Sequence, residues 1–175
     1  MNKTIAVFGS GIATENSLDW KTAYEVGALL AKAGFIMANG GYEGAMRASA
    51  QGAKSANGKT IGVTTDEFQD ARKNEFIDQE IRKPFWRERL FQLIDLADGF
   101  VVLNGGTGTL TELIVILEMG NKGFHEKPAV ILGSHMKKAI EALKQNPEVR
   151  IPKSFYFAET PKAAVEYLRK VLNYG

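Results

Sequence analysis

Short apolar runs alternate along the chain with segments of helical periodicity. The apolar runs are rich in β-branched or aromatic residues and lie at residues 4–8, 35–38, 60–64, 99–103 and 128–132. Runs of this length, closed by glycine or polar residues, are typical of strands that are covered on both faces of a parallel sheet. The pattern therefore predicts a parallel sheet.

The segments between these runs predict helices. In the first segment apolar residues recur at helical spacing from Leu18 to Ala33, and Gly34 ends the pattern. Further helices are expected over residues 45–56, from Pro84 as a first-turn residue to Ala97, after the glycines at 105–108, and over 135–144 and 160–172. Residues 66–83 are mostly charged, and only 75–77 resemble a strand, so we interpret this stretch as a mobile or substrate-facing segment.

Strands that alternate with helices predict an α/β fold, a single-domain Rossmann-like doubly wound parallel sheet with helices on both faces. A chain of 175 residues with 45% hydrophobic content is long enough for one such core, so we assign residues 1–175 to one domain. Glycine-rich stretches at 9–11, 40–44 and 105–108 each follow a predicted strand. In this topology they gather at the carboxyl edge of the sheet, where ligands bind.

The stretch Asn104-Gly105-Gly106-Thr107-Gly108 has the composition of a phosphate site. It carries no bulky side chain, so backbone N–H groups can approach a ligand, and the next helix adds its unpaired N–H groups and dipole. A turn that only requires positive φ angles is the alternative. Such turns seldom need three glycines and two hydroxyl groups, here those of Thr107 and the next residue but one, Thr109, so the composition favours phosphate binding.

Two charged residues near these loops have both a structural and a chemical interpretation. Thr109 and Glu112 fit a capping box, in which Thr109 caps the helix and Glu112 folds back to its amide. Arg89 lies near the start of a helix at the same edge, where it can bind phosphate or a ribose hydroxyl. Its alternative is an exposed ion pair near Glu88 or Asp95. The residues alone leave both alternatives open.

Other nucleotide motifs do not fit the sequence. The stretch from Gly9 nearly matches the dinucleotide fingerprint, but Thr14 replaces its third glycine and Asn39 stands where an acidic residue should hold the ribose. No glycine loop carries the Lys-Ser/Thr ending of a Walker loop. The sequence therefore favours a site for one phosphate, without a nicotinamide cofactor.

Composition narrows the chemistry further. The chain has no cysteine and two histidines, His125 and His135, so we expect no disulfide and no metal site. A net charge of +2 without a basic, aromatic-interleaved run argues against nucleic acid binding. No long apolar segment or cleavage-site pattern follows Met1, so we expect a cytoplasmic protein that does not bind membranes.

Several motifs together resemble the LOG family, the cytokinin-activating phosphoribohydrolases and related nucleotide nucleosidases. Residues 104–112, NGGTGTLTE, resemble the family signature PGGxGTxxE. Residues 40–46 are similar to its GGGxxGLM segment, 86–89 to its HERK-type segment and 123–128 to its GxHxKP segment. Order and spacing both match over roughly residues 5–132, which makes the resemblance far more specific than one glycine motif.

The resemblance implies a hydrolase that cleaves the N-glycosidic bond of a nucleoside 5′-monophosphate into free base and ribose 5-phosphate, without metal or redox cofactor. It makes Arg89 and Glu112 the catalytic pair. Family members are commonly homodimers or higher homo-oligomers, and the expected partner is a small-molecule nucleotide. With the glycine loops, the predicted substrate- or phosphate-binding residues are Gly9, Ser10, Gly40, Gly41, Gly44, Met46, Gly105, Gly106, Thr107, Gly108 and Thr109.

Three residues depart from the family pattern. Asn104 replaces a proline, Arg47 a glycine and Trp86 a histidine. Such changes are compatible with a divergent branch that keeps the phosphate loop but binds another ligand without catalysis, as the related molybdenum-cofactor carrier proteins do. The family is also often labelled lysine decarboxylase, but no lysine here resembles a pyridoxal-phosphate site.

Overall fold

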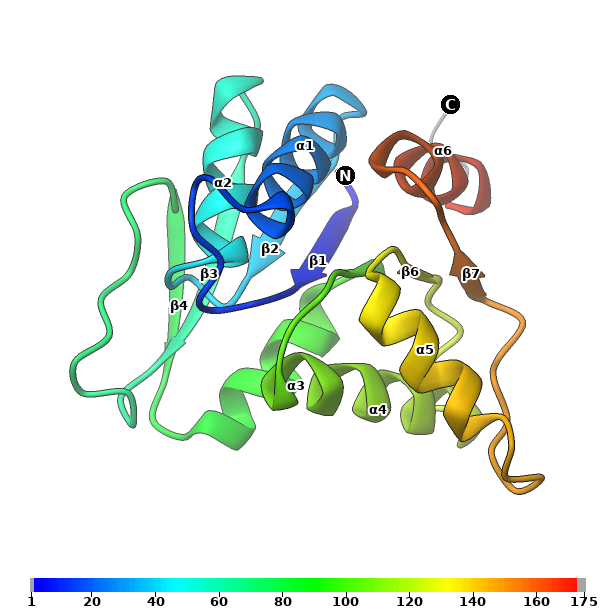
Figure 1. The fold of residues 1–175 in the computed structure, drawn as a ribbon. Helices are drawn as coiled ribbons and strands as arrows, with labels where there is room; N and C mark the ends of the chain where they lie inside the picture. Colours follow the sequence, from blue (N-terminus) through cyan, green and yellow to red (C-terminus); the bar gives the residue numbers. More distant parts are fainter. Residues whose placement is uncertain (1, 173–175) are drawn as a thin grey trace.

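The computed structural model describes residues 2–172 and forms one α/β domain around a seven-stranded sheet (Figure 1). The strand order is β4-β3-β2-β1-β5-β6-β7, and every neighbouring pair is parallel. The strands are β1 (Thr4–Phe8), β2 (Ile36–Asn39), β3 (Thr60–Thr65), β4 (Gln79–Lys83), β5 (Gly99–Val102), β6 (Ala129–Ile131) and β7 (Phe155–Phe157). The order confirms the predicted doubly wound fold, because the chain moves outward from β1 in both directions.

Helices cover both faces of the sheet, as Figure 1 shows. The first face is covered by α1 (Leu18–Lys32), α2 (Ala45–Ser55) and α6 (Pro161–Val171). The second is covered by α3 (Trp86–Leu96), α4 (Thr107–Asn121) and α5 (Ser134–Leu143). No helix within residues 2–172 is long and apolar enough to cross a membrane.

The central strands explain the continuous apolar runs in the sequence. In β1, Ile5 and Val7 pack into the core beneath α1, α2 and α6, whereas Ala6 and Phe8 pack into the opposite core. Phe8 also stacks on Phe100 of β5, with ring centroids 5.8 Å apart. Because both faces are buried, neither has to be polar. Because β1 and β5 are parallel neighbours in the sheet, the residues that follow them meet at the centre of its carboxyl edge.

Two local expectations were wrong. Residues 75–77 are not a strand: Glu75 and Phe76 form a turn, and the strand is β4, which begins at Gln79. This strand lies at the edge of the sheet and is largely exposed, so its polar residues gave little hydrophobic signal. Pro84 is not in the first turn of α3, because the helix begins at Trp86 with Phe85 as its N-cap.

Candidate functional site

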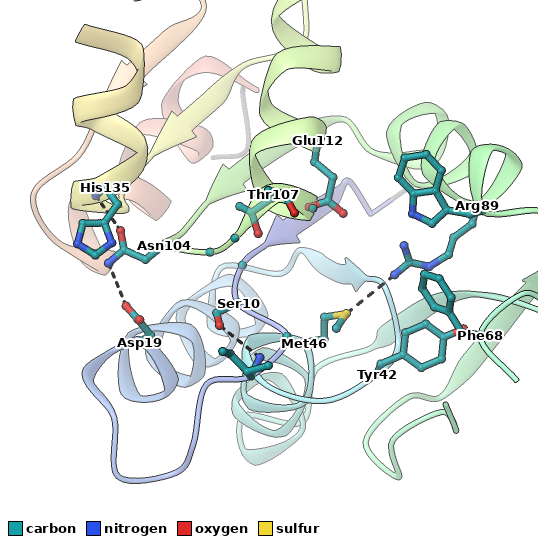
Figure 2. Close-up of a pocket in the computed structure, with 18 residues that line it drawn as sticks. Ser10, Asp19, Tyr42, Met46, Phe68, Arg89, Asn104, Thr107, Glu112 and His135 are labelled. Atoms are coloured by element: carbon teal, nitrogen blue, oxygen red, sulfur yellow. Dashed lines mark hydrogen bonds between the residues drawn. The ribbon is translucent and has the colours of Figure 1, made fainter. Parts of the chain in front are cut away.

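A cavity of about 590 Å³ opens at the carboxyl edge of the sheet, between the loops that follow β1 and β5 (Figure 2). This is the point where the strand order reverses, the usual ligand position in doubly wound folds. The walls come from the loops after β1, β2, β3 and β5 and from the beginnings of α1, α2, α3, α4 and α5. The lining residues are Gly9, Ser10, Gly11, Ile12, Asp19, Tyr42, Met46, Phe68, Trp86, Arg89, Asn104, Gly105, Gly106, Thr107, Gly108, Thr109, Glu112 and His135.

Residues 105–109, which lead from β5 into the first turn of α4 and are here called the 105–109 loop, present open backbone to this cavity. A Cβ atom added to Gly106 or Gly108 would meet no heavy atom within 4 Å, so both glycines border free space. Helix α4 begins at Thr107, and its N-cap, Gly106, has no side chain to bond the first-turn amides. Unpaired amides and the positive end of the helix dipole together favour an anion at this place.

The 40–44 loop contains glycines for a different reason. Gly40, Gly41 and Gly44 do not line the cavity, although we predicted them as binding residues. Gly41 and Gly44 have φ angles of 79° and 67°, and a Cβ on Gly44 would stand 2.2 Å from the carbonyl oxygen of Ser10. These glycines therefore lie behind the cavity wall, whereas Tyr42 of the same loop lines the cavity. Met46 and Ser10, also predicted, do line the cavity.

Arg89 is buried, with 5% of its surface exposed, and enters the cavity from α3. Its Nε donates to the Val63 carbonyl at 2.8 Å, and its Nη2 donates to the Gly40 carbonyl at 3.1 Å. Its guanidinium carbon lies 5.4 Å and 5.8 Å from the ring centres of Tyr42 and Phe68. These contacts exclude the alternative of an exposed ion pair. Burial lowers the pKa of Arg89, and the Glu112 carboxylate opposes that shift.

Glu112 enters the same end of the cavity from α4 (Figure 2). The capping-box interpretation is wrong, because the helix begins at Thr107 and Thr109 lies inside its first turn. Although the residue as a whole is half-buried, its carboxyl group is desolvated. Burial raises the pKa of Glu112 to about 7, and the positive charge of Arg89 opposes the rise. The cavity thus holds a fixed cation beside a carboxyl group that titrates near neutral pH.

Sequence reasoning missed several lining residues. Tyr42 and Phe68 pack against each other, with ring centroids 5.7 Å apart, and flank Arg89. Phe68 is one of two phenylalanines in the polar 66–83 segment, and its position agrees with the substrate-facing interpretation of that segment. Asp19 and His135, also missed, form the opposite end of the cavity together with Asn104 of the predicted glycine stretch. Within residues 2–172, no cluster of three His, Cys, Asp or Glu side chains is placed to hold a metal ion.

Comparisons with known proteins place the chain in a family. A family model described as the SLOG cluster4 family matches residues 2–164. The cytokinin riboside 5′-monophosphate phosphoribohydrolase of Mycobacterium tuberculosis is 36% identical over 135 residues, which cover 74% of this chain and 70% of that protein. An uncharacterized protein of Archaeoglobus fulgidus is 32% identical over 128 residues, covering 73% of this chain and 82% of that protein.

Solved structures show the same fold. The molybdenum cofactor binding protein from Rippkaea orientalis superposes with a TM-score of 0.80 at 26% identity, over 98% of both chains. The molybdenum cofactor carrier protein of Chlamydomonas reinhardtii superposes with a TM-score of 0.72 at 23% identity, over 99% of both chains. The family match and the identity to the mycobacterial protein together show that this chain belongs to the SLOG cluster4 family and is related to the LOG phosphoribohydrolases.

Proposed function

We propose that the protein hydrolyses the N-glycosidic bond of a nucleoside 5′-monophosphate and releases free base and ribose 5-phosphate. The observation that carries this proposal is the position of Glu112, which enters the cavity beside Arg89 and lies on the helix whose N-terminus forms the phosphate loop. The mycobacterial relative is named for this type of reaction and agrees with the proposal.

The first step in the proposed reaction is phosphate anchoring. The amides around Gly106 and Gly108 face open space at the positive end of α4 and would receive the 5′-phosphate. Glu112 follows Gly108 by one helical turn, so it lies on the same side of the helix. A phosphate held at the loop would therefore place the attached ribose next to the Glu112 carboxylate, and this binding energy would orient the reacting carbon.

Glu112 then acts on the bond that breaks. Cleavage of a glycosidic bond develops positive charge on the ribose ring, and a carboxylate in a desolvated position stabilises that charge strongly. A carboxyl group with a pKa near 7 can also take a proton from the attacking water at neutral pH. Both roles require the ionised form of Glu112.

Arg89 keeps Glu112 in that form. Its guanidinium group is fixed by the carbonyls of Val63 and Gly40, and its positive charge lowers the pKa that burial has raised. Two carbonyl acceptors leave other guanidinium N–H groups to contact the substrate. The exposed ring of Phe68 beside Arg89 provides a surface against which a base can stack.

A second function is favoured by one observation. The Rippkaea orientalis molybdenum cofactor binding protein matches over 98% of both chains, so its likeness extends beyond the glycine loops. A carrier of a phosphate-bearing ligand would use the 105–109 loop for binding and would not use Glu112 for catalysis.

The two functions differ in turnover. The wild-type protein is incubated with the 5′-monophosphates of adenosine, guanosine, inosine, cytidine and uridine, and free base is separated by chromatography. Catalytic release of base from at least one nucleotide supports the hydrolase. Binding of a nucleotide or of inorganic phosphate with no base released from any of the five contradicts it and favours the carrier.

A further inference from the structure

Asn104 makes two side-chain contacts that the proline of the LOG signature cannot make. Its Nδ2 donates to Oδ1 of Asp19 at 3.0 Å, and its Oδ1 accepts from the backbone N–H of His135 at 2.9 Å (Figure 2). Its backbone carbonyl oxygen, which a proline would also offer, accepts from the backbone N–H of Ser10 at 2.9 Å. The residue comes immediately before Gly105 and lines the cavity.

These contacts join three segments at the carboxyl edge of the sheet. Asp19 is in the first turn of α1, His135 is in the first turn of α5, and Asn104 itself leads into the phosphate loop. Helix α5 has Gly133 as its N-cap, which offers no side-chain acceptor, so Asn104 supplies the acceptor that a capping residue normally provides. The backbone at Gly133 also approaches closely, because a Cβ there would stand 2.3 Å from the Asn104 nitrogen.

The two polar atoms of the carboxamide have fixed roles. Asp19 is a carboxylate that only accepts hydrogen bonds when ionised, and the His135 N–H only donates. Position 104 therefore needs a donor on one side and an acceptor on the other, which an amide satisfies and a carboxylate does not. A carboxylate at this position would face the Asp19 carboxylate at hydrogen-bond distance.

We propose that Asn104 is a positioning residue, which ties the beginnings of α1 and α5 to the 105–109 loop and so holds the loop amides in the geometry that binds phosphate. The role in turnover rests on the proposed function, whereas the role in phosphate binding does not. Replacement of the family proline by asparagine is then an alternative way to fix the loop.

The test measures the dissociation constant for inorganic phosphate by calorimetry. Asn104→Ala removes both side-chain bonds and should weaken phosphate binding about tenfold, the change expected from loss of one or two net hydrogen bonds. Asn104→Asp keeps the acceptor for His135 but opposes two carboxylates, so it should weaken binding more than Asn104→Ala does. A requirement for the acceptor alone predicts the reverse order and would overturn the proposal.

Exchanging the two partners provides a rescue. Asp19→Asn combined with Asn104→Asp restores a donor-to-carboxylate bond between the two positions and should return the phosphate affinity to within about threefold of wild type. Asp19→Asn alone should also keep the phosphate affinity near that of wild type, because the new amide at position 19 still offers Asn104 an acceptor oxygen. If Asn104→Asp does not fold, the exchanged pair decides: weak phosphate binding by a folded exchanged pair contradicts the proposal.

A matched control separates positioning from general stability. Asn121 also joins two segments, since its Nδ2 donates to the Arg150 carbonyl at 2.9 Å, but it lies at the far end of α4. Asn121→Ala should leave the phosphate affinity unchanged. In turnover, Asn104→Ala should raise KM more than it lowers kcat, whereas equal loss of phosphate affinity in both alanine variants would show a purely structural role. Normal phosphate affinities with no hydrolysis by any protein would overturn only the proposed function, and absence of phosphate binding by wild type would overturn both.

Discussion

The 105–109 loop and the 40–44 loop look alike in sequence but use their glycines differently. Both follow a central parallel strand and precede a helix. At Gly106 and Gly108 an added Cβ meets nothing within 4 Å, whereas at Gly40 it would stand 1.8 Å from Nη2 of Arg89. At Gly106 and Gly108 the missing side chains leave open space beside the cavity, whereas at Gly105 and in the 40–44 loop they leave space for the protein itself.

The two loops therefore contribute different groups to the site. The 40–44 loop supplies a carbonyl that fixes Arg89, and the 105–109 loop supplies open amides on the helix that carries Glu112. Glycine content alone therefore does not identify a ligand loop. The helices that follow the two loops, α2 and α4, both have a glycine N-cap without a side-chain hydrogen bond, so the open space beside Gly106 and Gly108 is what distinguishes the 105–109 loop.

The largest expected effect is the loss of turnover when Glu112, on the helix that follows the 105–109 loop, is changed. Glu112→Gln keeps the size of the side chain but removes its charge, so turnover should fall about a hundredfold or more while phosphate affinity stays nearly unchanged. The control is Glu118→Gln, which alters an exposed residue of α4 that pairs with Lys122. Equal turnover of the two variants would return Glu112 to a structural role.

The next effect concerns the supporting loop. Gly44→Ala imposes a side chain at a φ of 67° and against the Ser10 carbonyl, so we expect a loss of about 2–4 kcal/mol in the free energy of unfolding. Gly123→Ala is the matched control, since Gly123 has a φ of 73° and open space around it. Denaturant unfolding of both variants separates the close contact from the backbone penalty. Equal losses would mean that the contact with Ser10 contributes nothing.

In the 105–109 loop, a glycine-to-alanine change should lower phosphate affinity and not stability. Gly108→Ala meets no neighbouring atom and lies in a helix, so stability should stay the same or rise by up to about 1 kcal/mol. The added methyl group would occupy the approach to the amides, and we expect phosphate affinity to fall about tenfold. Gly120→Ala, at the other end of α4, should leave the affinity unchanged. A Gly108→Ala variant that binds phosphate normally would exclude this loop as the phosphate site.

The last prediction concerns the pH dependence of turnover in the unmodified protein. In the proposed reaction the ionised form of Glu112 acts, and burial raises the pKa of Glu112 to about 7, so kcat/KM should fall about tenfold from pH 8 to pH 6. Arg89 lowers this pKa by its charge, so Arg89→Met should move the inflection to higher pH. The pH–rate profiles of both proteins measure the shift, and a flat wild-type profile from pH 5 to 8 would contradict it.

The order of strands and helices could be predicted from the sequence because burial on both faces of β1 and β5 leaves a continuous apolar run. The edge strand β4 could not, since its exposed residues carry no such pattern. Boundaries near glycine were also uncertain: the threonine expected as a cap, Thr109, lies inside α4 because Gly106 caps the helix instead.

The candidate site was predicted where residues are close in sequence and missed where distant segments meet. The 105–109 loop and Glu112 belong to one strand–loop–helix unit. Phe68, Asp19 and His135 line the cavity only because distant segments meet at the carboxyl edge of the sheet, and no local pattern reveals such contacts. Arg89 was identified by the family resemblance. Its burial could not be predicted, because its guanidinium group bonds to carbonyls of β3 and the 40–44 loop, which are distant in the sequence.

In the proposed reaction the bond between base and ribose breaks in this cavity and the phosphate ester stays intact. The most direct measurement incubates the wild-type protein with adenosine 5′-monophosphate and the other four nucleotides and quantifies base, ribose 5-phosphate and inorganic phosphate by mass spectrometry. We predict equal amounts of base and ribose 5-phosphate from at least one nucleotide, with no inorganic phosphate released. Release of inorganic phosphate and nucleoside, or recovery of every nucleotide unchanged, would contradict the account.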